Sequence, residues 1–219
     1  ADLDAHLADR RFHVVAAPGS GKTVLGLEVI RRLGRPALVL APTLGVRDQW
    51  IQRFVELFLR ASQPPPWISR DLESPGLLTV STYQSLHARL RKEPAARLAQ
   101  RLQEARVETL ALDEAHHLRN SWWKALADLV SALKHPFLVS LTATPPYDVP
   151  QLEWNRYASV CGEVDAEIGA AELVKAGSLC PHQDYIFFSR PAAGEEEIVR
   201  RFYREIASFV RDLCLDTQI

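Results

Sequence analysis

The stretch that decides the fold is HVVAAPGSGKTVLG, residues 13–26, in which a β-branched apolar run ends in Pro-Gly-Ser-Gly and is followed by Lys-Thr. Residues 16–23 fit the phosphate-loop pattern G-x-x-x-x-G-K-[ST], with alanine in place of the first glycine. An ordinary Gly-Ser turn before a helix is the alternative. The strand–loop–helix context is the one that the motif requires, so the stretch predicts a phosphate site at a helix N-terminus.

Each residue type in this loop has a physical task. Gly19 and Gly21 allow the backbone to curl so that successive N–H groups face inward and bind phosphate. We expect Lys22 to reach the β- and γ-phosphates and the Thr23 hydroxyl to bind Mg²⁺. The residues predicted to surround the nucleotide are Ala17, Pro18, Gly19, Ser20, Gly21, Lys22 and Thr23.

Beyond the loop, apolar β-rich runs alternate with helical patterns, which predicts an α/β fold: a mostly parallel sheet with helices on both faces. Ligands of such sheets bind beyond the carboxyl ends of the strands. The predicted strands are 12–17, 36–42, 77–83, 107–113 and 136–144, and the predicted helices among them are 22–33, 46–60 and 120–134.

After Pro146 the pattern is weaker. Residues 170–179 predict a short helix, and 184–189 a strand. Residues 195–214 predict a long helix with one apolar side. That side carries Ile198, Phe202, Ile206, Phe209 and Leu213.

Two further segments carry chemistry at predicted strand ends. LALDEAHHL, residues 110–118, places Asp113 and Glu114 after a buried strand, where a carboxylate is costly unless it has a cation to serve. SLTATPP, residues 140–146, places Thr142 and Thr144 near the same edge. Alone, the first segment also fits a charged helix cap and the second a strand and a turn. Beside a phosphate loop in one sheet, both favour a nucleotide site.

The composition limits the class of protein. With 219 residues, of which 47% are hydrophobic, the chain can bury a full core, which excludes global disorder. A net charge of -1 argues against a strongly basic nucleic-acid coat but leaves room for a local basic groove. No apolar run approaches the roughly 20 residues of a membrane span, so no membrane partner is expected. The widely spaced Cys161, Cys180 and Cys214 predict free thiols and a cytoplasmic location.

Five segments in order resemble motifs of the superfamily 2 helicases and translocases. AAPGSGKT resembles motif I, LVLAPTLGVRDQW motif Ia, VSTYQSL the segment after motif Ib, LDEAHH motif II, and LTATP motif III. The resemblance covers residues 12–146. The double histidine and the Thr-Ala-Thr-Pro-Pro run look more like the type III restriction subunit and excision-repair helicase group than like DEAD-box RNA helicases.

The resemblance implies a RecA-like domain that binds ATP and Mg²⁺. By position, Lys22 and Thr23 bind nucleotide and metal, Asp113 holds the metal, and Glu114 is the catalytic base. The same matching implies that His116, Thr142 and Thr144 couple the state of the bound nucleotide to the strength of nucleic-acid binding. It also implies that Pro42, Thr43 and Thr82 touch the sugar-phosphate backbone.

Two aromatic pairs have competing interpretations. His116 and His117 as metal ligands are disfavoured because adjacent histidines point different ways and no other ligand cluster is evident. We therefore expect coupling for His116 and a structural role for His117. Trp122 and Trp123 suit base stacking, but helical spacing favours a core position for Trp122.

The implied function is that of the N-terminal ATP-binding domain of an ATP-dependent DNA helicase or translocase, with nucleic acid, expected to be DNA, as partner. Residues 1–190 are expected to form the first RecA-like domain, and 191–219 a helix leading toward a second one that supplies arginine fingers. Alone, the chain is expected to be weakly active or inactive. The alternatives are a translocase subunit of a restriction or phage-defence complex without strand separation, and an inactive nucleotide-binding scaffold.

Overall fold

The computed structural model describes residues 10–117, 120–181, 185–189 and 192–216. The chain divides into two compact units, Ala1–Cys180 and Pro181–Ile219.

The described part of the first unit contains a seven-stranded sheet in the order β3-β4-β2-β5-β6-β1-β7, in which every pair is parallel. This confirms the predicted α/β fold with a parallel sheet. The strands are β1 (Arg11–Ala16), β2 (Ala37–Ala41), β3 (Ile68–Ser69), β4 (Leu78–Thr82), β5 (Thr109–Asp113), β6 (Phe137–Thr142) and β7 (Ala166–Ile168).

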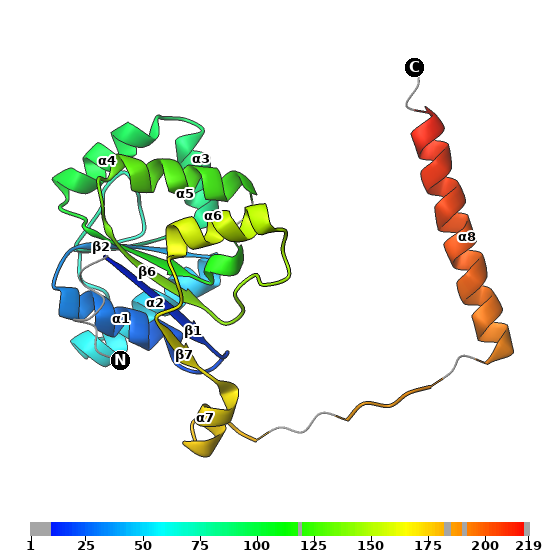
Figure 1. Ribbon diagram of the computed structural model, residues 1–219. Helices are drawn as coiled ribbons and strands as arrows, with labels where there is room; N and C mark the ends of the chain where they lie inside the picture. Colours follow the sequence, from blue (N-terminus) through cyan, green and yellow to red (C-terminus); the bar gives the residue numbers. More distant parts are fainter. Residues whose placement is uncertain (1–9, 118–119, 182–184, 190–191, 217–219) are drawn as a thin grey trace. The chain divides into compact units, whose positions relative to one another are not determined.

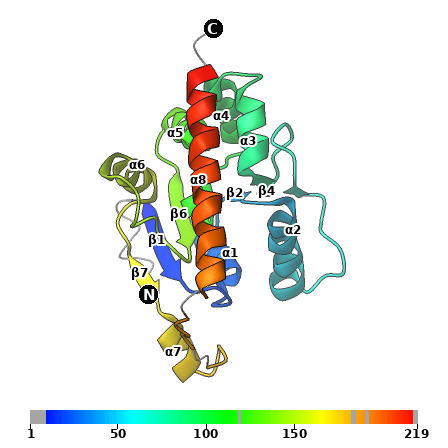
Figure 2. The same cartoon turned by 90° about the vertical axis from the view of Figure 1, so that its right-hand side faces the viewer.

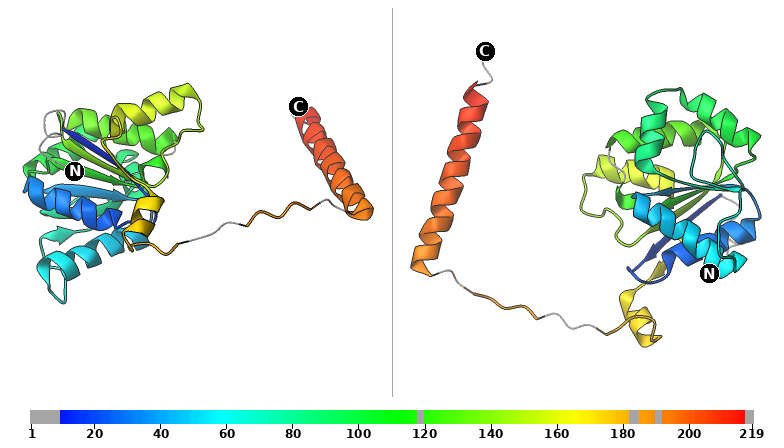
Figure 3. Two further views of the ribbon diagram at one scale, coloured as in Figure 1. Left: turned by 60° about the horizontal axis from the view of Figure 1, so that its bottom comes forward. Right: turned by 180° about the vertical axis from the view of Figure 1, so that it is seen from behind.

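Helices cover both faces of this sheet, as Figure 1 shows, with α3–α6 above it and α1 and α2 below. The same two layers can be followed from other sides in Figures 2 and 3. The helices of this unit are α1 (Lys22–Leu33), α2 (Leu44–Arg53), α3 (Tyr83–Leu90), α4 (Ala95–Glu104), α5 (Asn120–Ala132), α6 (Gln151–Cys161) and α7 (Ala170–Lys175), with a 3₁₀ turn η3 (Ala115–His117).

Local signals explain where these elements end. Helix α1 ends where Gly34 adopts a left-handed φ of 62° and donates its N–H to the Ile30 carbonyl, as expected for a glycine C-cap. The predicted helix 46–60 is α2 followed by a π-helical segment, η2 (Phe54–Leu59). Sequence periodicity does not distinguish these two windings.

A buried tryptophan links one helical layer to the sheet. Trp50 of α2 is fully buried and lies where a side chain on Gly26 of α1 would be. A Cβ at Gly26 would lie 2.5 Å from Trp50 Cη2 and 2.8 Å from Leu141 Cδ1. Glycine at position 26 therefore leaves the space that the indole fills between α1 and β6.

The second unit contains helix α8 (Ala193–Asp216), which confirms the long helix predicted at 195–214. The strand predicted at 184–189 is wrong for the residues that the structure describes, 185–189, which adopt no regular structure. Their apolar composition suits a strand, but a strand forms only where a neighbouring strand completes its backbone hydrogen bonds. Within the described part of the chain, no helix is long and apolar enough to cross a bilayer.

Candidate nucleotide site

The loop between β1 and α1 has the conformation that its glycines permit. Gly19 and Gly21 have φ values of 78° and 86°, in the region that residues with a Cβ rarely adopt. Gly21 is the N-cap of α1, so no side chain occupies the first N–H groups of that helix. These free N–H groups and the positive end of the helix dipole form an anion site.

Lys22 lies between the loop and the end of β5. Its Nζ donates to the Ala16 carbonyl oxygen at 3.0 Å and lies 3.4 Å from Glu114 Oε1. The side chain is only 9% exposed. A nearly buried cation with these two partners is held at the mouth of the loop, where the phosphates of a nucleotide would compete for it.

Asp113 ends β5 and is held by a hydrogen bond that sequence reasoning missed. The carboxylate is buried, and Trp50 Nε1 donates to its Oδ2 at 2.6 Å, while the Tyr83 hydroxyl donates to the Asp113 backbone oxygen at 3.0 Å. Burial raises the pKa of Asp113, and the nearby Glu114 adds to this, whereas the indole N–H and the charge of Lys22 lower it. The carboxyl group is thus desolvated but oriented.

Glu114 follows in a left-handed conformation, with φ of 49°, that is uncommon for a residue with a Cβ. Its Oε2 accepts from the Ala143 N–H at 3.4 Å and lies 3.3 Å from His116 Nδ1. The two contacts direct the carboxylate toward β6. Backbone strain at a carboxylate beside a phosphate loop is typical of functional sites.

A short chain of contacts connects Glu114 to the end of β6. His116 Nδ1 lies 2.7 Å from Thr142 Oγ1, and that hydroxyl oxygen also accepts from the Thr144 N–H at 3.3 Å. Thr142 is buried and Thr144 exposed. The three predicted coupling residues therefore lie together, next to the predicted base.

The glycine loop, Lys22, Asp113 and Glu114 surround one cavity of about 410 Å³. The coupling residues lie beside it, joined to Glu114 through His116. The sheet order brings them together, because β6 lies between β1 and β5, with Val15 opposite Thr142 and Asp113 opposite Leu141. The predicted residues that line the cavity are Pro18, Gly19, Gly21, Lys22, Thr23, Asp113 and Glu114. Ala17 and Ser20 belong to the same loop, and the Ser20 hydroxyl is buried without a partner among the described residues.

Helix α2 adds a third wall that the motifs alone did not predict. Val46, Gln49 and Arg53 line the cavity at i, i+3 and i+7, which is one helical face. The sequence contains this helical spacing, but the spacing identifies a face of the nucleotide cavity only once α2 is known to pack beside α1. Arg53 is half exposed and lies 3.7 Å from Glu56, so its guanidinium is available to a ligand.

The predicted nucleic-acid residues lie at the same edge of the sheet, farther along it. Thr43 and Thr82 are the N-caps of α2 and α3, and their hydroxyls accept from the Val46 and Ser85 N–H groups at 3.2 and 3.1 Å. Thr82 is buried, Thr43 is exposed, and Pro42 is half-buried. Their roles toward nucleic acid stay predictions.

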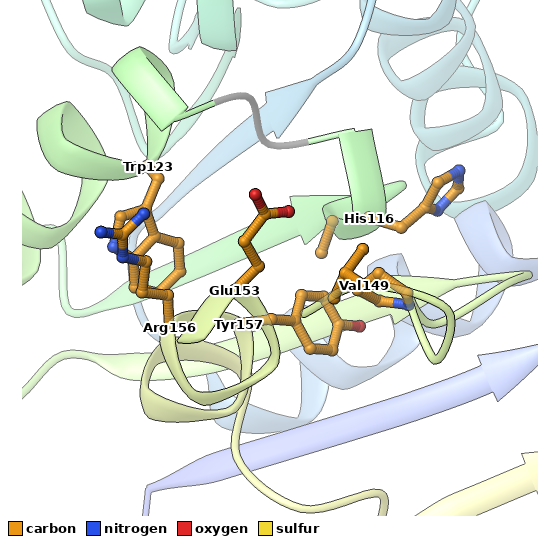
Figure 4. Close-up of a pocket in the computed structure, with 8 residues that line it drawn as sticks. His116, Trp123, Val149, Glu153, Arg156 and Tyr157 are labelled. Carbon is orange, nitrogen blue, oxygen red and sulfur yellow. The ribbon is translucent and has the colours of Figure 1, made fainter. Parts of the chain in front are cut away.

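A second, smaller cavity lies between His116 and helix α6, and His116 itself lines it. Figure 4 shows Trp123, Glu153, Arg156 and Tyr157 around it, with the His116 ring pointing away from Glu153 and Arg156. Its volume of about 80 Å³ is too small for a nucleotide. Trp122 packs in the core against Tyr83, as predicted, and the side chain of His117 lies outside the described residues.

The donor set fits magnesium better than a transition metal. Among the described residues, no group of three His, Cys, Asp or Glu side chains is placed to hold a metal ion. Mg²⁺ needs less from the protein, because it keeps several waters and is bound through one or two carboxylates plus substrate phosphates. Asp113 and Thr23, both on the wall of the cavity, provide such a partial set.

Comparison with protein families and curated proteins gives consistent matches. A family model described as "Type III restriction enzyme, res subunit" matches residues 4–147. The "DNA 3'-5' translocase XPB2" of Sulfurisphaera tokodaii is 29% identical over 146 residues, which is 67% of this chain and 30% of that protein. The "Putative helicase 055L" of Frog virus 3 is 31% identical over 134 residues, 58% of this chain and 27% of that protein. The chain thus spans less than a third of the length of either relative.

Solved structures share the fold. The Pyrococcus furiosus Hef helicase domain matches with a TM-score of 0.55 and 22% identity, covering 75% of this chain and 36% of that one. The UvsW helicase from bacteriophage T4 matches with a TM-score of 0.52 and 16% identity, covering 73% and 54%. At these identities the likeness concerns the fold, which is that of a RecA-like helicase domain.

Proposed function

The chain belongs to the family of type III restriction enzyme res subunits, whose model covers more than half of it, and from this premise we propose that it is the nucleotide-binding half of an ATP-driven motor that moves on DNA. It contains a helicase-type ATP-binding domain. The observation that carries the proposal is the convergence of Lys22, Asp113 and Glu114 on one cavity beside a glycine loop.

In the proposed reaction, the loop and Lys22 hold the phosphates of ATP. The N–H groups after Gly21 bind phosphate oxygens, and Lys22 exchanges its contacts with Ala16 and Glu114 for the β- and γ-phosphates. Thr23 and Asp113 would hold Mg²⁺, which neutralises negative charge on the phosphates when bound. Trp50 fixes one Asp113 oxygen and leaves the other for the metal or for its water shell.

Glu114 is the proposed general base. When Lys22 turns to the phosphates, Glu114 is released from its 3.4 Å ion pair and is able to orient a water molecule and take its proton. His116 and Thr142, which join Glu114 to the end of β6, would transmit the presence of the γ-phosphate to Thr144 and the following loop. Coupling of this kind requires an element with two arrangements.

Two considerations support an active motor on DNA. An inactive scaffold has no use for a nearly buried lysine beside a strained glutamate, and both are kept here. The relative from Sulfurisphaera tokodaii is named a DNA translocase, which favours DNA over RNA. A translocase within a restriction or defence complex is compatible with the same site and is a narrower form of this proposal.

Rapid turnover is expected to need a second RecA-like domain. The described cavity is lined by Lys22 and Arg53 as cations, whereas phosphoryl transfer in phosphate-loop enzymes gains about 10³–10⁵ in rate from an arginine finger. We therefore expect the 219-residue chain to bind Mg·ATP but to hydrolyse it slowly.

The test compares wild type with Glu114→Gln, in the chain and in any longer form of the protein that carries a second RecA-like domain. The amide keeps the shape of the side chain but cannot take a proton, so Mg·ATP affinity should be kept while hydrolysis falls by several orders of magnitude. Single-stranded DNA, duplex DNA and RNA are compared as activators. Near-normal turnover in Glu114→Gln contradicts the role of Glu114, and activation by RNA alone contradicts the choice of DNA.

A further inference from the structure

The edge of the sheet opposite to the nucleotide site, formed by the amino ends of the strands, gathers basic residues in left-handed backbone conformations. Arg10 precedes β1, Arg106 follows α4, and Lys134 and His135 follow α5, with φ values of 59°, 56°, 55° and 71°. These turns are fixed by the strands that they precede, since the Leu138 N–H donates to the Arg10 carbonyl at 2.8 Å.

Glycine or asparagine would adopt these conformations at lower cost, because the Cβ of other residues clashes in the left-handed region. The sequence nevertheless has arginine, lysine and histidine at all four positions. Cations at the C-terminal end of a helix interact favourably with the helix dipole, which partly explains Arg106 and Lys134. That reason does not apply to Arg10, which precedes a strand. Arg60 also has a positive φ, so the conformation alone indicates no use, but four such residues gather at this edge.

These side chains also lack the partners that other cations of the fold have. Among the described residues, no hydrogen bond or ion pair is made by the side chains of Arg10, Arg106 or Lys134, and Arg10 Nε is buried without a partner. Their neighbours differ, since Arg35 pairs with Glu108 and Arg101 with Glu93. The excess positive charge at this edge is therefore local, although the whole chain carries a net charge of -1.

Two adjoining cavities give these cations a shared surface. One of about 560 Å³ and one of about 300 Å³ are both lined by Arg10, Lys134, His135 and Pro136. Arg106 lines the smaller one and Arg11 the larger. The lining contains no Phe, Tyr or Trp among the described residues, whereas protein interfaces and single-strand binders rely on aromatic side chains.

We propose that this surface, the basic edge of Arg10, Arg106, Lys134 and His135, binds the phosphate backbone of duplex DNA. This would be a second DNA contact, at the amino ends of the strands, whereas the nucleotide cavity lies at their carboxyl ends. The choice of DNA as the ligand rests on the proposed function. Unpaired cations around a polar groove match phosphates, and the absence of stacking side chains favours a duplex over a single strand. Glu108, which also lines the groove, is neutralised by Arg35.

The test uses Arg106→Asn and Lys134→Asn in the 219-residue chain, because asparagine removes the charge and tolerates a positive φ. Arg60→Asn is the matched control. Arg60 is exposed, has φ of 51° and follows η2, which packs on the other face of the sheet and lines neither cavity. Binding of a fluorescent DNA duplex is measured by anisotropy without nucleotide, over a range of KCl concentrations.

We expect each substitution at the basic edge to reduce the slope of log K against log salt by about 0.9, and the double variant by about 1.8. Arg60→Asn should keep the wild-type slope, and all variants should keep their thermal midpoint and their Mg·ATP affinity. Equal slopes in wild type and the double variant overturn the inference, as does an equal loss in Arg60→Asn. Stronger displacement of the protein by polyglutamate than by unlabelled duplex also overturns it, in favour of an acidic protein.

Failure of the proposed function would look different. If the wild-type chain binds no duplex at any salt concentration, this inference fails, while the proposed function is still decided by the Glu114→Gln comparison and by the activator series. If wild type binds duplex and the basic-edge variants bind like wild type, only this inference fails.

Discussion

Trp50→Phe removes the single indole donor to Asp113 and keeps an aromatic ring in the core. In the native chain Trp50 Nε1 donates to Asp113 Oδ2 at 2.6 Å, and both residues are buried. The variant leaves that buried oxygen without its donor. The expected effect is thus a lower free energy of unfolding.

The magnitude follows from two contributions. A hydrogen bond to a charged group contributes about 1.5–3 kcal/mol to stability. Replacing the indole by a smaller ring adds about 1 kcal/mol, as for other modest core truncations. We expect Trp50→Phe to lower the free energy of unfolding by about 2.5–4 kcal/mol, a large share of the total for a domain.

Urea denaturation of a double-mutant cycle isolates the hydrogen bond. Asp113→Asn keeps an acceptor but removes the charge, and neutral hydrogen bonds contribute only about 0.5–1.5 kcal/mol. Trp50→Phe should therefore cost about 1 kcal/mol less in the Asp113→Asn background than in wild type. If the two substitutions are additive within about 0.5 kcal/mol, the indole does not support the charged carboxylate and the reasoning is refuted.

Two other predictions concern the stability of the first unit, one on each face of its sheet. Gly26→Ala should lower the unfolding free energy by about 1–3 kcal/mol, because its Cβ would meet Trp50 at 2.5 Å; an equal or higher urea midpoint contradicts this. Burial lowers the pKa of His13, which lies against Tyr157, Gly162 and Asp165. Stability should therefore fall as pH drops below about 6.5, where the unfolded chain gains a proton that the native chain refuses. His13→Asn should make the urea midpoint depend less on pH between pH 7 and 5. If the midpoint of the variant varies with pH as in wild type, His13 is not the group responsible.

Local signals in the sequence were enough to predict the parallel sheet and the loop. The strand before Ala17, the glycines at 19 and 21 and the C-cap at Gly34 each depend on neighbouring residues only. Asp113 and Glu114 were placed at the same edge because parallel strands bring their carboxyl ends together.

What the sequence did not predict depends on contacts between distant elements. The three-residue strand β7 is too short for a periodic pattern, and it exists because Val14 and its neighbours pair with it. The strand order depends on pairing between strands that are far apart in the sequence. The donation from Trp50 to Asp113 and the approach of Arg53 to the nucleotide cavity require the packing of α2. Conversely, residues 185–189 have strand-like composition without a neighbouring strand, so local composition misled.

The central claim is that Mg·ATP binds in the cavity at the phosphate loop, and calorimetric titration of the wild-type chain and Lys22→Ala with Mg·ATP tests it directly. Lys22 is the loop cation nearest to Glu114, so its loss should abolish measurable binding, while Arg32→Ala, on the exposed end of α1, should bind like wild type. Equal affinity in Lys22→Ala and wild type would contradict the nucleotide site and, with it, the motor function.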